Sequence, residues 1–574
     1  MRSWKERFPE RFEHELAAFA ERGLDFELDP TLLAEQGRVV LRGVLSHGGK
    51  DIDLEVHYPD LFPYLRPEVL AKGLSLSRHQ NPYEGNLCLL DRSTRAWNPS
   101  DTGAWLVAER VPHLLDLLDA GGEDLREAEV PQGEPQSSYF RTQLATAIFV
   151  PAEALELSAD VTVGSGRISC SVAEPPQLRV RGLLSELVEK RGTKKTRTLA
   201  RADELLRTRF GGATIPLRWV RLAAAPADNT PQAVLDAIEG VQPGFGSPPW
   251  EGVHGGQVAI AAAVFAEEVR QDEYEDTWVF VIQVRQGDGS AGSYLVRGER
   301  LSRDDLEARL PATTRLAERT VALAGLGALG SVIGFELARA GLGTLRGLDF
   351  DTIEAGTTVR WARGITAVGH LKTDYMRQAI ELDYPYTKFE PFAHQIGGSA
   401  HQLTARQETE LDVLERFLSG SDLMIDATAE IGIQQALGAE ANDRGIPQLY
   451  VSATEGARGG LVARVDPQQG GCWLCLQWHL NDGSIPLPAL DRGPTLQPRG
   501  CAALTYAGAG YDLLPVIAQA ARVAAATLSE EDGAGSSDVF ICTFEEGDGL
   551  QPPTWSSHSL DRHPSCPICA GKER

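Results

Sequence analysis

Long apolar runs and an excess of positive charge are both missing from this sequence of 574 residues. No apolar run reaches the roughly 18 residues that a membrane-spanning helix needs. The first residues, Met1-Arg-Ser-Trp-Lys-Glu-Arg, lack the apolar core of a signal peptide. The net charge of −25 argues against nucleic-acid binding, which usually requires a basic surface. We therefore expect a cytoplasmic protein that binds neither nucleic acid nor membrane.

Cysteine is scarce, with eight residues, but most of the cysteines are clustered. In a cytosolic protein, clustered cysteines indicate metal binding or catalysis rather than disulfides. Two Cys-x-x-Cys pairs supply the four thiolates of a closed tetrahedral zinc site: Cys472, Cys475, Cys566 and Cys569. We predict a structural Zn²⁺ there, the alternative being separate reduced cysteines. Cys170 and Cys542 lie in strand patterns and are expected in the core.

A glycine-rich turn follows an apolar strand pattern and precedes a helical pattern. It contains Gly325, Gly327 and Gly330, and this context makes G-x-G-x-x-G indicative of a phosphate site at a helix N-terminus. Asp349 and Asp351 end the next apolar segment, where an acidic residue suits a ribose hydroxyl. The glycines alone also fit a nicotinamide dehydrogenase, or a packing turn that binds no ligand.

Two cations make ATP the better prediction. Arg360 and Lys372 follow the aspartates within one strand-helix unit. A hydride-transfer site has little use for them, whereas displacement of pyrophosphate from ATP develops negative charge that they would stabilise. The alternative is that both are solvated surface cations.

This stretch resembles the adenylation domain of ubiquitin-activating enzymes and of their ThiF/MoeB-type bacterial relatives in thiamin and molybdopterin synthesis. The shared pattern is G-x-G-x-x-G-S, then D-F-D-T-I, then Arg360, then G-x-x-Lys372. The resemblance implies that the three glycines line ATP, that Asp351 holds the ribose, and that Arg360 and Lys372 hold phosphates. The family usually has Asn three residues before the Arg, where this chain has Thr357.

The sequence at the expected magnesium ligand differs from the family pattern. Leu423 to Asp426 is typical of a buried strand whose end faces the ligand crevice. The family usually has Asp-x-Thr-Asp here, with Mg²⁺ on the second Asp, but this chain has Ala429 followed by Glu430. Either Asp426 or Glu430 is left for that role.

Cys501 matches the catalytic cysteine that the family carries in a loop before the last helix of this domain. The resemblance implies thioester formation at Cys501, and the neighbouring Arg499 would lower its pKa.

The first segment opens with a helical pattern from Pro9 to Arg22, followed by a hairpin pattern that ends at Tyr58. Beyond it, His79-Gln-Asn81-Pro-Tyr-Glu-Gly-Asn-Leu-Cys88-Leu and then Trp97-Asn-Pro resemble the active-site strip of ubiquitin-conjugating enzymes, with Gln in place of the usual Pro. The resemblance implies a thioester on Cys88 and an oxyanion steadied by the Asn81 amide. The alternative for Cys88 is a buried core cysteine.

We therefore predict a multidomain protein of α/β and α+β class. Residues 1–130 form a ubiquitin-conjugating-like α+β domain, residues 131–305 a linker and a middle α/β region, and residues 306–574 a Rossmann-like adenylation domain with a zinc knuckle. By position alone, the middle region matches the inactive adenylation half that some activating enzymes carry.

Two cysteine sites and one ATP site predict a relay that uses ATP and Mg²⁺. A protein C-terminal carboxylate is adenylated, captured on Cys501, passed to Cys88 and joined to a target lysine. Fusions of this type resemble proteins of bacterial antiphage operons such as CBASS. The activated protein would be ubiquitin-like or a CD-NTase-type synthase, a peptidase of the same operon would reverse the bond, and the enzyme would be a homodimer. The alternatives are a sulfur-carrier adenylyltransferase and a non-catalytic scaffold.

Overall fold

The computed structural model divides the chain into two compact units, Met1–Leu301 and Ser302–Arg574. It describes all residues except 1–3, 91–95, 121–132, 141–145, 153–154, 156, 174–178, 192–194, 203, 254–255, 311–315, 399–408, 491–495, 497–504, 530–536, 545–551 and 570–574. Within the described residues, no helix combines the length and the apolar character needed to cross a bilayer.

The N-terminal part of the first unit is a four-stranded antiparallel sheet with helices before and after it. The strands lie in the order β1-β2-β3-β4, and a core that contains Phe19, Leu41 and Leu54 fills one face. The predicted helix and hairpin are confirmed as α2 and as the β2–β3 pair. The elements are α1 (Trp4–Arg7), α2 (Pro9–Glu21), β1 (Phe26–Leu28), α3 (Pro30–Gln36), β2 (Val39–His47), β3 (Lys50–Tyr58), β4 (Glu68–Leu70), α4 (Gly103–Trp105), the π-helix η1 (Leu106–Arg110) and α5 (Val111–Ala120).

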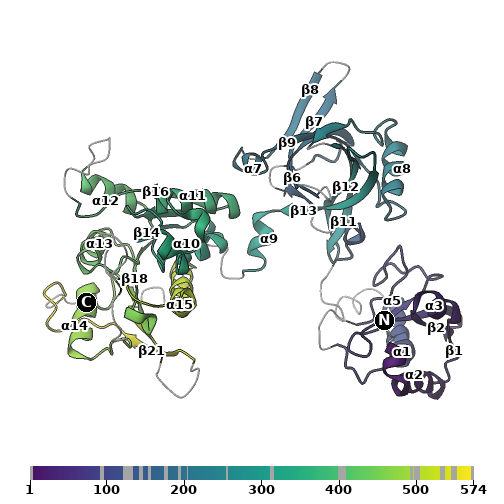
Figure 1. Cartoon of the computed structure of the whole chain (residues 1–574), viewed down its shortest axis with the longest axis horizontal. Helices are drawn as coiled ribbons and strands as arrows, with labels where there is room; N and C mark the ends of the chain where they lie inside the picture. The colour runs from purple at the N-terminus through teal and green to yellow at the C-terminus, as the bar shows by residue number, and fades with distance from the viewer. Residues whose placement is uncertain are drawn as a thin grey trace. The chain divides into compact units, whose positions relative to one another are not determined.

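The rest of the first unit is a β-barrel, so the predicted α/β middle region is wrong (Figure 1). Seven strands pair in a closed ring, β11-β12-β13-β5-β7-β6-β9, and β9 returns to β11. An adenylation half would need a parallel sheet with crossover helices, which the described part of this region does not form. The elements are η2 (Gln136–Tyr139), β5 (Ala147–Pro151), β6 (Val163–Ala173), β7 (Arg179–Arg191), β8 (Lys195–Arg201), α7 (Glu204–Arg209), β9 (Ala213–Arg221), α8 (Pro231–Val241), β10 (Glu251–Val253), β11 (Gly256–Arg270), β12 (Glu273–Arg285) and β13 (Ala291–Leu301).

Strand β11 explains why the barrel escaped sequence analysis. Its central run Ala-Ile-Ala-Ala-Ala-Val-Phe has no polar face, because both sides of the strand are buried. Ile260 and Val264 join the inner cluster of the barrel, while Ala261 and Phe265 pack on the outside with helix α8. Without alternation, a short apolar run does not distinguish a strand from a buried helix.

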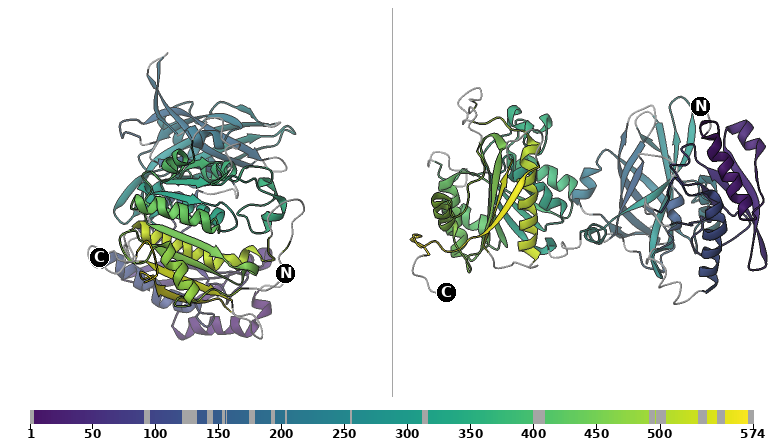
Figure 2. Two further views of the ribbon diagram at one scale, coloured as in Figure 1. Left: turned by 90° about the vertical axis from the view of Figure 1, so that its left-hand side faces the viewer. Right: turned by 90° about the horizontal axis from the view of Figure 1, so that it is seen from below.

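The second unit is built on an eight-stranded sheet with helices on both faces (Figure 2). The strand order is β16-β15-β14-β17-β18-β19-β20-β21. The first five strands are parallel and the last three are antiparallel additions. The strands are β14 (Thr320–Ala324), β15 (Thr344–Leu348), β16 (Lys388–Phe392), β17 (Leu423–Asp426), β18 (Gln448–Ala453), β19 (Gly459–Val465), β20 (Asp538–Thr543) and β21 (Thr554–Ser559).

The helices of the second unit form two layers. One layer, with α10 and α15, packs on a core that contains Ile333, Val516 and Ala520; the other contributes Phe417, Leu437 and Trp473 to a second core. The helices are α9 (Arg303–Glu307), η4 (Leu316–Glu318), α10 (Gly330–Arg339), η5 (Ala355–Val359), η6 (Ile365–Ala367), α11 (Lys372–Asp383), α12 (Glu410–Leu418), α13 (Ile431–Asp443), η8 (Glu455–Ala457), α14 (Trp473–Asp482) and α15 (Gly510–Ser529). Cys542 on β20 and Cys170 on β6 are buried, as predicted.

Candidate active sites

The glycine-rich turn joins β14 to α10, and two of its glycines are required by close contacts. Gly325 has φ +80°, and a Cβ there would lie 2.8 Å from the backbone of Ala427. A Cβ on Gly330 would lie 1.8 Å from the carbonyl oxygen of Gly325, so this glycine lets the helix approach the strand. Gly327 instead faces open space, which leaves its backbone accessible to a ligand at the N-terminus of α10.

Asp349 braces this turn from inside the protein. Its Oδ2 accepts the backbone N–H of Leu326 at 2.8 Å, and its Oδ1 accepts the N–H of Asp351 at 2.9 Å. The side chain is only 8% exposed. Both carboxylate oxygens therefore accept hydrogen bonds from the protein backbone. Asp349 stabilises the turn, whether or not a ligand is bound.

Asp351 and Lys372 form an ion pair in the chain that follows the carboxyl end of β15. Lys372 is the first residue of α11, and its Nζ lies 2.9 Å from Asp351 Oδ2 and 3.4 Å from Asp349 Oδ2. Asp351 is half exposed, so one of its oxygens can reach a ligand. The two predicted ligand-binding residues are thus brought together beside the glycine-rich turn.

The Arg360 side chain contacts Thr505 and Tyr506, the two residues that follow the undescribed segment 497–504. Its Nη1 donates to the carbonyl oxygen of Tyr506 at 2.9 Å and its Nη2 to Thr505 Oγ1 at 2.8 Å, while the guanidinium lies 4.6 Å from the Tyr506 ring centroid. Thr505 pairs with Leu496 across the base of that segment. Cys501 lies within it, outside the described residues, and its role stays a prediction.

Trp361 supports the same turn and was not singled out from the sequence. Its indole N–H donates to the carbonyl oxygen of Leu326 at 2.8 Å, and the side chain is buried. Only the adjacency of an aromatic residue to Arg360 pointed to it. Together, Asp349 and Trp361 hold both backbone polar groups of Leu326.

Asp426 ends β17 beside the turn, paired in register with Ala324. The residue is fully buried, and Oδ1 accepts both the N–H and the hydroxyl of Thr428, at 2.9 and 2.7 Å. Oδ2 has no hydrogen-bond partner among the described residues. Burial raises the pKa of Asp426 to about 6. A buried, unpartnered oxygen at this edge suits a hard cation such as Mg²⁺.

The positions after Asp426 differ from a metal-binding pattern. Ala429 has φ +59°, a left-handed conformation that non-glycine residues rarely adopt. Glu430 follows as the exposed N-cap residue of α13, and its backbone N–H donates to Thr428 Oγ1 at 3.3 Å. Of the two candidates for the cation, Asp426 therefore has the better-placed free oxygen.

Cys88 lies at the surface of the first unit, and none of the seven described cysteines is in a disulfide. Its backbone N–H donates to the carbonyl oxygen of His79 at 2.7 Å, and the neighbouring residues Gln80 and Leu87 form an antiparallel bridge. Exposure excludes the alternative of a buried core cysteine. Asn81 is mostly buried, and its Oδ1 accepts the N–H groups of Tyr83 and Glu84 at 2.9 and 3.3 Å.

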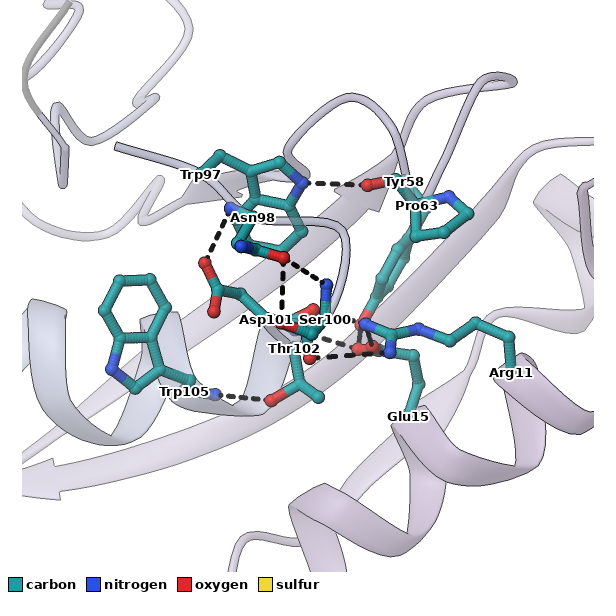
Figure 3. Close-up of polar contacts among 11 residues, drawn as sticks. Arg11, Glu15, Tyr58, Pro63, Trp97, Asn98, Ser100, Asp101, Thr102 and Trp105 are labelled. Atoms are coloured by element: carbon teal, nitrogen blue, oxygen red, sulfur yellow. Dashed lines mark hydrogen bonds and ion pairs between the residues drawn. The ribbon is translucent and has the colours of Figure 1, made fainter. Parts of the chain in front are cut away.

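A polar cluster joins the other segments of the conjugating-like pattern to helix α2 (Figure 3). Glu15 is fully buried and accepts the hydroxyl of Tyr58 at 2.9 Å and the N–H of Gly103 at 2.8 Å. Desolvation by burial raises the pKa of Glu15. The indole N–H of Trp97 donates to the carbonyl oxygen of Pro63 at 2.9 Å. Segments that are far apart in sequence thus meet on one helix.

The four predicted zinc ligands converge. Cys472 Sγ lies 3.8 Å from Cys475 Sγ and 3.7 Å from Cys566 Sγ, and all four sulfurs, including that of Cys569, are within 4.8 Å of one another. Tetrahedral zinc with Zn–S bonds of about 2.3 Å separates its sulfurs by about 3.8 Å. The donor set and its spacing therefore fit zinc.

A histidine network lies directly behind these cysteines, and the sequence pattern did not indicate it. The backbone N–H of His563 donates to Cys475 Sγ at 3.3 Å, and its Nε2 lies 3.0 Å from Asp482 Oδ2. His479 contacts Ser484 Oγ and the carbonyl oxygen of Asp561, so its two ring nitrogens are occupied. The network ties α14 to the C-terminal knuckle rather than forming an open metal site.

Comparison with known proteins identifies the second unit. Residues 302–525 match the ThiF family. They form a ThiF/MoeB-type adenylation domain, which confirms the Rossmann-like prediction for this part of the chain.

Two relatives match nearly the whole chain, and a third matches a segment. The uncharacterized protein y4oA of Sinorhizobium fredii (strain NBRC 101917 / NGR234) is 29% identical over 98% of this chain and 97% of its own length. The uncharacterized protein y4qC of the same strain is 30% identical over 90% of this chain and 89% of its length. The ATP-dependent ubiquitin transferase-like protein Cap2 of Enterobacter hormaechei subsp. hoffmannii (strain UCI 50) is 28% identical over 25% of this chain and 22% of its own.

Proposed function

Because this chain belongs to the family of the proteins y4oA and y4qC and carries a ThiF-type domain, we propose that it activates a protein C-terminus and conjugates it to lysine. The observation that carries the proposal is the exposure of Cys88 in a conjugating-like strip, on the same chain as an adenylation domain. An accessible thiol suits a thioester carrier, and the adenylation domain suits the step that activates the carboxylate.

The first step joins the carboxylate to AMP. A carboxylate oxygen attacks the α-phosphorus of ATP, and the bond to the β-phosphate oxygen breaks to release pyrophosphate. Lys372 and Arg360 contribute positive charge where negative charge develops, and Asp351 holds the ribose. Mg²⁺, when bound, would neutralise phosphate charge, and the free oxygen of Asp426 would hold it.

The following steps are transfers between sulfur and nitrogen. The Cys501 thiolate attacks the acyl carbon and AMP leaves, giving a thioester. The Cys88 thiolate then attacks this carbon, and the thiolate of Cys501 leaves. Finally a lysine amine attacks the acyl carbon of the Cys88 thioester and loses a proton, the Cys88 thiolate leaves, and an isopeptide bond remains. The acyl group stays activated until the last step.

The partners are proposed from the resemblance stated above, and the similarity to Cap2, an ATP-dependent ubiquitin transferase-like protein, supports a ubiquitin-like substrate. We expect the activated protein to be ubiquitin-like or a CD-NTase-type synthase, encoded with a deconjugating peptidase in an antiphage operon. We expect a homodimer in which structural zinc ties the Cys-x-x-Cys knuckles together.

Mass spectrometry of the intact protein tests the relay. The wild type, Cys88→Ala and Cys501→Ala are each incubated with ATP, Mg²⁺ and the proteins encoded beside this chain, and ATP–pyrophosphate exchange is measured in parallel. A thiol-labile adduct that is lost in Cys501→Ala, and confined to Cys501 in Cys88→Ala, is expected. Exchange without an adduct on either cysteine would support a sulfur-carrier adenylyltransferase, and the absence of exchange would support a scaffold.

A further inference from the structure

The strip that leads to Cys88 is docked on the barrel through a buried ion pair. Arg78 Nη1 lies 2.7 and 2.8 Å from the two carboxylate oxygens of Glu268 on β11, and these side chains are 13% and 9% exposed. Glu268 also accepts the backbone N–H groups of Glu134 and Asp272, at 3.1 and 2.9 Å. One barrel carboxylate therefore fixes both the strip and the segment that enters the barrel.

A second contact runs from that segment toward the thiol. Glu134 Oε1 accepts the backbone N–H of His79 at 3.1 Å and lies 3.4 Å from His79 Nδ1. His79 has φ +60°, a conformation that a non-glycine residue keeps only when its surroundings hold it. The carbonyl oxygen of the same residue accepts the N–H of Cys88 at 2.7 Å. Glu134 is thus linked to the backbone of Cys88 through one intervening residue, His79.

Apolar packing completes the interface. The Tyr83 ring lies 6.1 and 5.4 Å from the rings of Tyr139 and Phe140, and its hydroxyl donates to the carbonyl oxygen of Pro226 at 3.2 Å. Buried Glu267, next to Glu268 on β11, accepts the N–H and the hydroxyl of Ser137 at 2.8 and 2.7 Å. The short helix η2 is therefore anchored to the barrel on one side and to the strip on the other.

We propose that the barrel and residues 133–140 form a fixed wall of the Cys88 site, in which Glu134 is a positioning residue that sets Cys88 through His79. The role of Cys88 rests on the proposed function, whereas the wall rests on these contacts. The seven-stranded ring closes on itself through the β9–β11 pairing, so the strands of the ring are paired on both sides. Under this proposal the four-stranded domain and the barrel stay together, within the unit Met1–Leu301, during any transfer to Cys88.

Two measurements on the full-length protein test the wall without ATP or a protein substrate. One is hydrogen exchange at the Cys88 amide, and the other is the rate and pH profile of Cys88 alkylation by iodoacetamide, read on the Cys88 peptide. Glu134→Ala is expected to accelerate exchange of this amide about tenfold, because His79 loses an acceptor. It is also expected to change the alkylation profile.

Matched variants separate positioning from general stability. Glu134→Gln keeps an oxygen that can accept from His79 and should restore wild-type exchange and alkylation. Glu273→Ala removes an exposed barrel carboxylate and should change neither. Arg78→Ala should reproduce the effect of Glu134→Ala. Wild-type exchange and alkylation in a folded Glu134→Ala protein, or an equal change in Glu273→Ala, would overturn the proposal. Failure of the thioester relay would leave this result unaffected.

Discussion

The sequence placed Asp349 and Asp351 together as nucleotide ligands, but their contacts predict opposite responses to the same substitution. Asparagine has one acceptor oxygen where aspartate has two. In Asp349 both oxygens accept backbone N–H groups, the buried one of Leu326 and the part-buried one of Asp351. Asp349→Asn therefore leaves one N–H group facing the new NH₂ group. An unsatisfied buried donor costs about 1–3 kcal/mol, and about 1.4 kcal/mol is a tenfold change in an equilibrium constant.

Hydrogen exchange with mass spectrometry measures this cost at the turn itself. In Asp349→Asn, the amide of Leu326 or of Asp351 should exchange roughly 10- to 100-fold faster than in the wild type. Asp351→Asn is the matched control. Its half-exposed side chain contacts Lys372, and such a pair contributes only about 0–1 kcal/mol. Exchange at the Leu326 amide in this variant should stay within about fivefold of the wild type.

For nucleotide binding, we expect a loss of affinity in Asp351→Asn, the variant that leaves amide exchange at the turn nearly unchanged. Asp351→Asn removes the carboxylate expected to hold the ribose, so ATP affinity measured by calorimetry should fall about tenfold while the turn stays protected. If Asp349→Asn left both amides protected, the brace would be refuted. If Asp351→Asn bound ATP as the wild type does, its assignment to the ribose would be wrong.

Three further changes test other parts of the second unit. Asp426→Asn should raise the free energy of unfolding at pH 7.5 by about 3 kcal/mol, because burial raises the pKa of this carboxyl from 3.8 to about 6. A raised carboxyl pKa favours folding most at low pH, so this gain should shrink as pH falls from 6 toward 3.8, which guanidinium titrations at pH 7.5 and 5 would detect. Cys566→Ser should abolish the zinc measured by elemental mass spectrometry, whereas Cys542→Ser, in the buried strand β20, should retain about one ion per chain. Arg360→Ala should slow adduct formation on Cys501 more than it slows pyrophosphate exchange, because Arg360 also contacts Thr505 and Tyr506. Lys372→Ala should slow adduct formation only as far as it slows exchange, since the adduct forms from the adenylate.

Local patterns were sufficient where one segment determines the feature. The glycine spacing and the strand Leu423–Asp426 were predicted correctly. Close backbone contacts require glycine and complete burial favours an apolar run, so both features can be recognised within one short segment. The four cysteines converge as their spacing suggested. The exposure of Cys88 also agrees with the strip in which it lies.

Long-range contacts were not predictable from the sequence. The barrel depends on a run in β11 that is buried on both sides and so carries no period. The bracing role of Asp349 depends on a hydrogen bond to Leu326, 23 positions away. The contact between Glu134 and His79 joins residues 55 positions apart, neither of which belongs to a spacing pattern shared with the other. Such pairs become visible only once the chain is folded.

The contacts of the two cations also constrain how a nucleotide can bind. Lys372 is paired with Asp351 and Asp349, and Arg360 donates to Tyr506 and Thr505. Both cations therefore already have partners within the protein before phosphate binds. Phosphate binding must therefore exchange existing hydrogen bonds for new ones. If Lys372 binds a phosphate in place of Asp351, the Asp351 carboxylate is released to face the solvent, where the ribose is expected. For Arg360 the exchange releases Thr505, which closes the base of segment 497–504 together with Leu496. Under the proposed function, ATP binding at the glycine-rich turn is thus coupled through one guanidinium to Thr505 and Tyr506, which follow Cys501 by four and five positions in the sequence.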